Sequence, residues 1–511
     1  TRSFNSNDIQ HCLFGNSLQQ CNHIVVSGSD VAGRSKQDWL ADYFYLPTDF
    51  QSILAFNPVI DNFIIDPTVY FGLDEWIKGM YFTLYFPIVH SRWDLQFQER
   101  VISAGVANDV PGSVTADVTG LPRQDLLNNF TEYANGQTIA PVNNVDNIIF
   151  GGLEYALIRS QKNIKTRVAD IRATMGIDII NNDTGRFGLY LEGAAPTGNK
   201  PEACYLFEAI VGNNFHWEFG FGISGQYNFW CSADENHNTS LIIQGSFTHL
   251  FGKQHIRTYD LIDKPLSRYM LAQRMTDKVT NLLADTQAPG YQFADEYAPL
   301  ANLTTMPVDV KIALQADIVC MLHYTNSCWN VDLGYNFWAR SCERIDAIAE
   351  DSRLRRESWA LKGDASLFGF TQGTNAPVAL SSTQSNAAIY AGAPGGIDNP
   401  KLAFNGGSIP LLQEPNGVDQ ISTSAPVVLL SLDDVSLVGT RGMSSTVFAH
   451  INFNFDEQEN TWKPFIGIGG QAEFAHGGKC HSSPTCKPCP PCLPCAVSQW
   501  GFWIKGGASF N

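Results

Sequence analysis

The chain has 511 residues, of which 44% are hydrophobic and 16% charged, and its formal net charge is −17. Soluble domains average about 25% charged residues, so this chain is poor in charge. The negative charge argues against nucleic acid as a partner, because nucleic-acid sites are basic. The mean hydropathy is −0.11, and the sequence has no run of eighteen apolar residues. A helical membrane protein is therefore excluded.

Alternation of apolar and polar residues predicts strands along most of the chain, but not in residues 1–50. Pro58 and residues 74–78 mark turns between the first of these strands. The predicted strands cover residues 51–57, 63–73, 79–97, 168–180, 186–195, 204–211, 215–230, 240–251, 254–261, 309–323, 329–340, 446–455, 463–475 and 498–510.

The clearest strand is the stretch 215–230, FHWEFGFGISGQYNFW. Alternate positions of a strand form two sets, here called parities. The odd-numbered parity of this stretch is Phe215, Trp217, Phe219, Phe221, Ile223, Gly225, Tyr227, Phe229. The other reads His216, Glu218, Gly220, Gly222, Ser224, Gln226, Asn228, Trp230. Successive side chains of a strand point to opposite faces, so one face is apolar and the other polar. The aromatic residues at both ends of the apolar face are typical of a strand that crosses a membrane and meets two interfaces.

Nine further strands show the same asymmetry, and across all ten the apolar parity contains no Asp, Glu, Lys or Arg, with His249 as its only ionisable side chain. A Lys or Arg that faces lipid at mid-bilayer costs about 2–4 kcal/mol. The opposite parity keeps its charges, which indicates a wet lumen rather than the dry core of a sandwich. The pattern predicts an all-β fold, a transmembrane antiparallel up-and-down β-barrel of about 14 strands (about 12–16) over residues 51–510.

Short and long connections alternate along the C-terminal half. Outer-membrane barrels have short periplasmic turns and long extracellular loops, so the C-terminus is expected on the periplasmic side. Large loop insertions are expected over residues 102–163, 262–307 and 341–445, with a Cys/Pro-rich loop over 477–497. Helical spacing predicts short helices within residues 265–284 and 343–359. Residues 1–50 are expected to plug or cap the periplasmic mouth, and the chain is interpreted as an exported precursor without its signal peptide.

In this architecture the chain resembles the porins and major outer-membrane proteins of Gram-negative bacteria. The resemblance covers residues 51–510, and the last strand is similar to the family's C-terminal assembly signal, with Trp500, Phe502, Ile504, Gly506, Ala508 and Phe510. It implies a β-barrel in the bacterial outer membrane, surrounded by outer-membrane lipid and assembled as a homo-oligomer or lattice. It also implies passive diffusion of small hydrophilic solutes or ions, with no cofactor and no enzymatic activity.

The polar parity supplies the candidate pore-lining residues: Asp170, Arg172, Asp178, Glu192, Glu208, His216, Glu218, Gln226, Lys311, Gln315, Asp317, His323, Asp332, Arg340, Glu473 and Lys505. Alternating charges in the loop 341–445 suggest a mouth or constriction formed by Glu350, Asp351, Arg353, Arg355 and Arg356. Loops 262–307 and 341–445 are expected to narrow the pore, because their apolar residues need burial.

Catalytic motifs are poor. The stretch 193–200, GAAPTGNK, departs from a phosphate-binding loop because Asn199 precedes Lys200 and a strand, not a helix, is expected next. The strand-borne acids could form a hydrolytic pair inside a barrel, but the sequence shows no Ser/His/acid set. Acid-rich loop pieces lack the ligand spacing of a calcium site. A barrel-type hydrolase is therefore the third hypothesis, and no metal site is predicted.

The chain contains 12 cysteines and is expected to pass an oxidising compartment. Cys204 and Cys231 begin and end a predicted hairpin, where a bridge is geometrically reasonable. The CxxC repeats of KCHSSPTCKPCPPCLPC resemble a metal-ligand run, with Cys480 and His481 as the best metal pair, but the prolines favour an extended form. At least two disulfides from this loop are predicted instead. The disulfide candidates are Cys12, Cys21, Cys204, Cys231, Cys480, Cys486, Cys489, Cys492 and Cys495.

Two functional classes follow. The first is a water-filled diffusion channel whose lumen charges set ion preference. The second is a structural surface protein, anchored by its barrel, whose loops form a disulfide-linked coat. The charged lumen favours the channel, and the large loops and cysteine cluster favour the coat. The channel is ranked first.

Overall fold

The structure of the chain is a computed structural model. It describes residues 1–14, 23–35, 37–108, 121–141, 148–233, 237–275, 279–280, 289–290, 293–326, 328–356, 358–362, 368–370, 377–379, 387–390, 429–455, 462–476 and 492–510.

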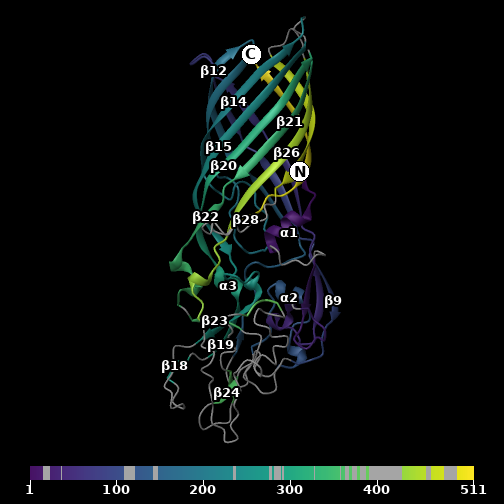
Figure 1. Ribbon diagram of the computed structural model, residues 1–511, viewed down its shortest axis with the longest axis vertical. Coiled ribbons are helices and arrows are strands. Elements are labelled where there is room, and N and C mark those ends of the chain that lie inside the picture. The colour runs from purple at the N-terminus through teal and green to yellow at the C-terminus, as the bar shows by residue number, and fades with distance from the viewer. Residues whose placement is uncertain are drawn as a thin grey trace, which may run out of the picture.

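One large, mostly antiparallel sheet dominates the fold and confirms the all-β prediction. Each of its long strands pairs antiparallel with the next in chain order. These strands are β12 (Ile171–Asn182), β13 (Gly185–Ala195), β14 (Glu218–Cys231), β15 (His237–Thr258), β20 (Thr305–Asn326), β21 (Trp329–Arg340), β26 (Gly439–Asn454), β27 (Trp462–Ala475) and β29 (Gln499–Phe510). In Figure 1 they run obliquely to the long axis at one end of the molecule.

The first part of this sheet consists of half strands. Pro67 separates β5 (Val59–Ile65) from β6 (Thr68–Gly72), and Pro87 separates β7 (Met80–Tyr85) from β8 (Ile88–Asp94), because proline lacks the N–H that a ladder needs. β5 pairs with β8 and β6 with β7, while β8 and β7 continue to β11 (Asn163–Val168) and β12. Such interruptions raise the sheet to 17 segments, compared with the 14 strands expected.

Three short strands complete the large sheet. β1 (Arg2–Ser3) pairs antiparallel with β29 on one side and with β5 on the other. β22 (Glu343–Ala347) pairs with the first part of β20, and β28 (Cys492–Pro494) lies parallel to the start of β26.

The opposite end of the molecule, here called the loop region, contains two four-stranded sheets. The first is formed by β2 (His23–Ser27), β3 (Trp39–Leu40), β4 (Gln51–Ala55) and β9 (Gln98–Ser103), and the second by β10 (Ile149–Phe150), β16 (Leu271–Met275), β19 (Phe293–Pro299) and β23 (Trp359–Leu361). Two short hairpin pairs are β17 (Val279–Thr280) with β18 (Pro289–Gly290) and β24 (Phe368–Phe370) with β25 (Pro377–Ala379).

The helices are short. The α-helices are α1 (Ser6–Phe14), α2 (Phe130–Ala134) and α3 (Leu300–Thr304). The 3-10 helices include η2 (Ala41–Phe44), η3 (Arg123–Asp125), η4 (Ser267–Tyr269), η5 (Ala349–Asp351), η6 (Arg353–Arg356) and η7 (Leu432–Asp434). Within the described part of the chain, no helix is long and apolar enough to cross a membrane.

The hydrophobic core lies in the loop region, where Trp39 stacks on Tyr269 and Phe44 meets Phe130 edge-on. The large sheet is different, because its apolar face is exposed: 53% of Phe219 and 57% of Phe221 are accessible, whereas Glu218 on the other parity is 3% exposed. The facing predicted for this strand is therefore confirmed. The two faces are called the apolar face and the polar face below.

Several predicted elements are wrong. Residues 51–57 form β4 in a small sheet, because Leu54 is buried in the core of the loop region. Residues 204–211 form no strand, and residues 254–258 continue β15 instead of starting a new strand. The helices expected within 265–284 and 343–359 are replaced over their described residues by short strands and 3-10 turns.

The N-terminal segment also lies elsewhere than expected. Residues 1–14 lie at the end of the large sheet that faces the loop region, with α1 beside β28 (Figure 1), whereas β2 and β3 lie in the loop region itself. Cys12 of α1 is bonded to Cys495, which follows β28. The described residues of segment 1–50 therefore lie on the side of the loop region, and not at the end of the large sheet that carries the short turns.

Candidate functional site

The polar face of the large sheet carries a cavity of ≈ 540 Å³. Register explains why residues from five strands meet there: Asp317 lies opposite Trp338, Asn336 opposite Thr446, and Thr446 opposite Glu473. Because paired residues share a face, the cavity lies on the side away from the exposed apolar residues. Its lining is Asp317, Val319, Asn336, Trp338, Thr446, Phe448, Gln471, Glu473 and Trp503.

Two carboxylates give this cavity its charge. Asp317 Oδ1 accepts a hydrogen bond from the Asn336 side-chain amide. The two oxygens of Glu473 accept from Ser444 Oγ (2.6 Å) and Gln499 Nε2 (2.5 Å). These neutral donors orient the carboxylates without neutralising them, and the lining contains no Lys, Arg or His. The cavity is therefore anionic when both acids are ionised.

Aromatic rings lie flat against the wall of the cavity, and glycines on the adjacent strands make room for them. A Cβ at Gly442 would lie 2.4 Å from the Trp338 ring, one at Gly334 2.2 Å from the Phe448 ring, and one at Gly469 2.5 Å from the Trp503 ring. Each ring therefore occupies the space that a neighbouring side chain would fill. The sequence does contain a signal for this wall, namely glycine and aromatic residues at polar-face positions, but the predicted pore-lining residues included only charged and polar side chains.

A row of two histidines and one aspartate adjoins the cavity. Register places Asp332 between His323 and His450. His323 Nδ1 lies 2.6 Å from Asp332 Oδ1, and His450 Nδ1 lies 3.1 Å from Asp332 Oδ2. The His450 ring stacks on Trp503 at 6.3 Å, which joins the row to the cavity. Thr325 Oγ1 lies 2.9 Å from His323 Nε2, so a Thr–His–Asp chain exists, but the stabilising donors of a hydrolase site are not seen among the described residues around it.

A second charged cluster spans β12, β13 and β14. Arg172 donates to Glu192 (2.5 Å) and to Glu218 (2.9 Å), so its planar guanidinium joins two acids. Asn213 donates its side-chain amide to Glu218 at 2.7 Å, and its backbone N–H binds Asp170. The predicted residues Asp170, Arg172, Glu192 and Glu218 are thus brought together as one network.

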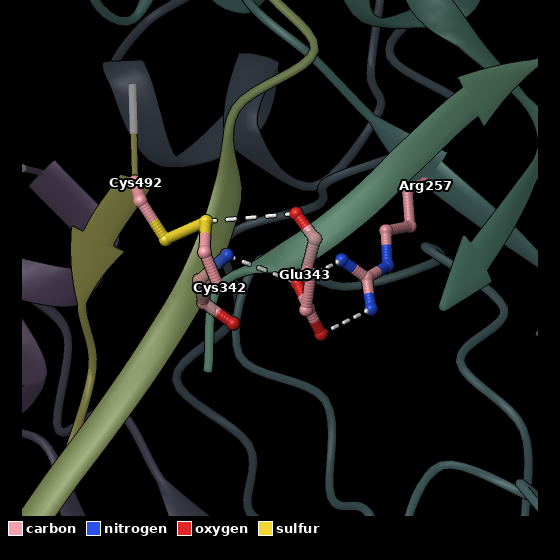
Figure 2. Close-up of a disulfide and its surroundings, with 5 residues drawn as sticks. Arg257, Cys342, Glu343 and Cys492 are labelled. Atoms are coloured by element: carbon pink, nitrogen blue, oxygen red, sulfur yellow. Dashed lines mark hydrogen bonds and ion pairs between the residues drawn. A yellow bond between two sulfur atoms is a disulfide. The ribbon is translucent and has the colours of Figure 1, made fainter. Parts of the chain in front are cut away.

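Figure 2 shows a third feature, at the junction of the large sheet and the loop region. Glu343 has a side chain that is 1% exposed and accepts two hydrogen bonds from Arg257, at 2.8 and 3.0 Å. The backbone N–H of Thr440 donates to the same carboxylate at 3.0 Å. The bonds to Arg257 hold the pKa of Glu343 down to about 2, against the effect of burial. One carboxylate therefore joins β15, β22 and β26.

Two buried histidines lie behind this ion pair. The rings of His216 and His255 meet edge-on at 4.9 Å, and His255 Nδ1 is 3.4 Å from Arg257. Burial, together with the adjacent cation Arg257, lowers the pKa of His255 to about 4. His216 Nδ1 is bonded to the Phe251 carbonyl, and burial lowers its pKa too. Both rings are therefore neutral near pH 7.

Two disulfides leave the Cys/Pro-rich loop, as predicted. Cys342–Cys492 ties it to the turn after β21 (Figure 2), and Cys12–Cys495 ties it to α1. The pairing of Cys204 with Cys231 is wrong, because both thiols are free. Cys342 was missed, since nothing in its local sequence sets it apart. Four cysteines lie outside the described residues: Cys21, Cys480, Cys486 and Cys489.

The remaining predicted pore-lining residues separate into two groups. Asp178 lies near Arg186 (3.7 Å), Gln226 donates to Ser240, and Lys505 lies over the Phe465 ring, all on the polar parity. Gln315 is paired with Arg340, whose guanidinium lies 5.9 Å from the Trp338 ring.

Other predicted residues lie off the polar face. Lys311 is half exposed and lies 3.8 Å from Asp346. Register shifts between β15 and β20 invert the facing of the first part of β20, so Lys311 does not lie on the polar face. Glu208 is in a loop, where it accepts from the N–H groups of Glu202 and Ala203. His216 is fully buried before β14.

The five residues predicted at a mouth or constriction, Glu350, Asp351, Arg353, Arg355 and Arg356, are exposed on η5 and η6. Arg353 lies 3.3 Å from Glu154, and none of the five lines the cavity. The segment 373–420, expected to help narrow the pore, falls almost entirely outside the described residues.

Comparison with protein-family models and with curated proteins found no match for this chain. Among the described side chains, no group of three or more His, Cys, Asp and Glu is placed to hold a metal ion. The function is therefore argued from the geometry of the polar face.

The disulfides give a direct test. Digestion under non-reducing conditions is expected to yield linked peptides containing Cys12 with Cys495 and Cys342 with Cys492, because both pairs are bonded. Cys204 and Cys231 are expected to react with a thiol reagent in the unfolded, unreduced chain. A linked Cys204–Cys231 peptide would contradict the structure, and Cys342→Ser should remove only the linkage to Cys492.

Proposed function

We propose that the chain forms a transmembrane β-barrel in the bacterial outer membrane and conducts small hydrophilic solutes or ions. The observation that carries this proposal is the contrast between the two faces of one sheet. The apolar face exposes Phe219, Phe221 and Leu333, while the polar face carries the cavity with Asp317 and Glu473. A soluble sheet would bury the first face and solvate the second.

The order of the strands supports closure of the sheet. β29, the last strand, pairs with β1, β1 pairs with β5, β5 with β8, and β8 with β11, the strand before β12. Closure removes sheet edges, and in lipid an unpaired backbone group costs several kcal/mol.

Charges at the ends of the apolar face support a bounded apolar band. Towards the loop region this band ends at Phe251 and Leu314, and the charged side chains of Lys311 and Arg344 follow. A hydrocarbon-facing band flanked by charge is the expected pattern for a strand that crosses a bilayer. Glu343, His255 and the disulfides lie beyond this band, on the loop side.

A second function, a disulfide-linked structural coat, has its own support. The two disulfides join α1, the β21–β22 turn and the Cys/Pro-rich loop within one chain. Links between chains would need further cysteines. The channel is the preferred function because the coat requires no cavity on the polar face.

Purified protein reconstituted in planar bilayers tests the channel. We expect stepwise, ohmic conductance increments in potassium chloride, because a polar lumen with charged walls is wetted. The matched control is the same protein heated to unfolding before reconstitution. Bilayers that incorporate folded protein but show no conductance would contradict the channel and leave the coat as the proposed function.

A further inference from the structure

We infer that the cavity on the polar face is a binding subsite for small organic cations, of the amine or quaternary ammonium class. This inference rests on the proposed channel and names the solute class that its lumen selects. It combines three independent features of the wall: two carboxylates with no cationic residue in the lining, aromatic faces, and a size that fits a small molecule.

The charge of the cavity comes from Asp317 and Glu473. Their partners Asn336, Ser444 and Gln499 are neutral donors, so they hold the carboxylates in place without adding a counter-charge. This differs from the Arg172 cluster on the same sheet, where one guanidinium balances two acids. The cavity thus attracts cations and repels anions when both acids are ionised.

The rings of Trp338, Phe448 and Trp503 supply the second feature. Each lies against a glycine of an adjacent strand, so its position in the wall is fixed. Aromatic faces attract organic cations electrostatically, and tryptophan does so most strongly. A small inorganic cation gains less from such a wall than a methylated ammonium, whose apolar surface also packs on the rings.

Size is the third feature. A cavity of ≈ 540 Å³ lies within the range of about 300–1,000 Å³ typical of small-molecule sites. It also continues into the row formed by His323, Asp332 and His450, since His450 stacks on Trp503. A third carboxylate, Asp332, therefore lies along the same face of the sheet.

The test compares choline with 3,3-dimethylbutan-1-ol, an uncharged molecule of the same shape. In planar bilayers containing the reconstituted protein, choline is expected to reduce the potassium current at millimolar concentration, and the alcohol is not. Reversal potentials in gradients of choline chloride are expected to show that choline permeates in preference to chloride.

Variants separate the contributions. Asp317→Asn with Glu473→Gln should weaken choline block by on the order of tenfold or more, because it removes both charges that concentrate cations in the cavity. Trp503→Leu should weaken block while keeping cation-over-chloride selectivity, because it leaves both charges in place. Asp178→Asn is the matched control, an acid of the polar face outside the cavity, and should leave block unchanged. Heat-modifiable electrophoretic mobility shows that each variant is folded.

The outcomes distinguish this inference from the proposed function. Conductance with equal effects of choline and the alcohol, or with block unchanged in the folded double variant or in folded Trp503→Leu, overturns the cation subsite and leaves the channel standing. Absence of conductance in the folded wild type overturns the channel and the subsite together. Block that the double variant and Trp503→Leu lose, and Asp178→Asn keeps, supports the subsite.

Discussion

Replacing Glu343 by Gln is expected to destabilise the junction between the large sheet and the loop region by about 3–5 kcal/mol, the usual effect of removing one partner of a buried ion pair. Glu343 is buried and accepts hydrogen bonds from Arg257 and from the backbone of Thr440. A glutamine keeps the shape but leaves Arg257 buried without a counter-charge. The effect is measured as a fall in the thermal midpoint in detergent, followed by near-ultraviolet circular dichroism.

Asp346→Asn is the matched control, because Asp346 lies on the same strand but is half exposed, 3.8 Å from Lys311. Exposed pairs contribute about 0–1 kcal/mol, so this variant should melt close to the wild type. Equal midpoints for Glu343→Gln and Asp346→Asn would show that the buried pair does not hold the junction together.

The same groups make the junction sensitive to acid, in two windows. The pKa of Glu343 is lowered from 4.5 to about 2, so the unfolded state binds more protons between these values and stability is lost as pH falls through them. The pKa of His255 is lowered from 6.5 to about 4, so stability is also lost as pH falls from 6.5 to about 4. Arg257 lies beside both groups and opposes protonation of His255.

A pH series of thermal midpoints separates the two windows. Glu343→Gln should flatten the curve below about pH 4.5 and leave the upper window. His255→Asn should reduce the slope of the curve between pH 6.5 and about 4, where His216 still contributes, and leave the lower window. A wild-type midpoint that is constant from pH 7 to pH 3 would contradict both assignments.

The face of each strand could be read from the sequence where the strand is regular. In β14 the parity of Phe219 and Glu218 is the parity seen in the structure, because period-two alternation has no alternative reading over such a length. In β20 the same rule fails for Lys311. Register shifts near Leu250 move the first part of β20 into the loop region, where Val310 is buried, and parity alone does not show a bulge.

The composition of the cavity could be predicted only in part. Asp317 and Glu473 were identified by strand parity, because each acid lies on a long, regular strand. His450 was not, since its role depends on register: it becomes a partner of Asp332 only when β26 is aligned with β21. Trp338 and Trp503 were not predicted to line the cavity, because aromatic residues at polar-face positions depart from the alternation of apolar and polar residues. Cross-strand glycines explain them.

Cysteine pairing could also be predicted only in part. The loop 477–497 was correctly predicted to form bridges, because its prolines and compartment argue for disulfides. The partners Cys12 and Cys342 are separated from it by 483 and 150 residues. Such distances carry no local signal, and the hairpin that suggested Cys204 with Cys231 does not exist, because residues 204–211 form no strand.

Deleting residues 1–4 is expected to have the largest effect on the large sheet, because β1 pairs with β29 on one side and with β5 on the other. Arg2 is aligned with Trp500 of β29 and with Asp61 of β5. Thr1 and Asn62 exchange two backbone contacts, at 2.7 and 2.8 Å. Without the segment, β29 and β5 each lose the backbone partner that β1 provides, and in the proposed membrane barrel the exposed edge would be costly in lipid.

Gly501→Val tests the same joint by a single substitution, for which the chain offers a matched control. A Cβ at Gly501 would lie 2.7 Å from Thr1 Cγ2, so a valine pushes β1 away from β29, whereas a Cβ at Gly506 meets its nearest atom at 3.6 Å. Overpacking of this kind costs about 1–3 kcal/mol. Heat-modifiable mobility and resistance to trypsin should fall in Gly501→Val, and to a greater extent in the deletion, while Gly506→Val resembles the wild type. A deletion variant that stays heat-modifiable and protease-resistant would show that the sheet does not depend on β1 for its stability.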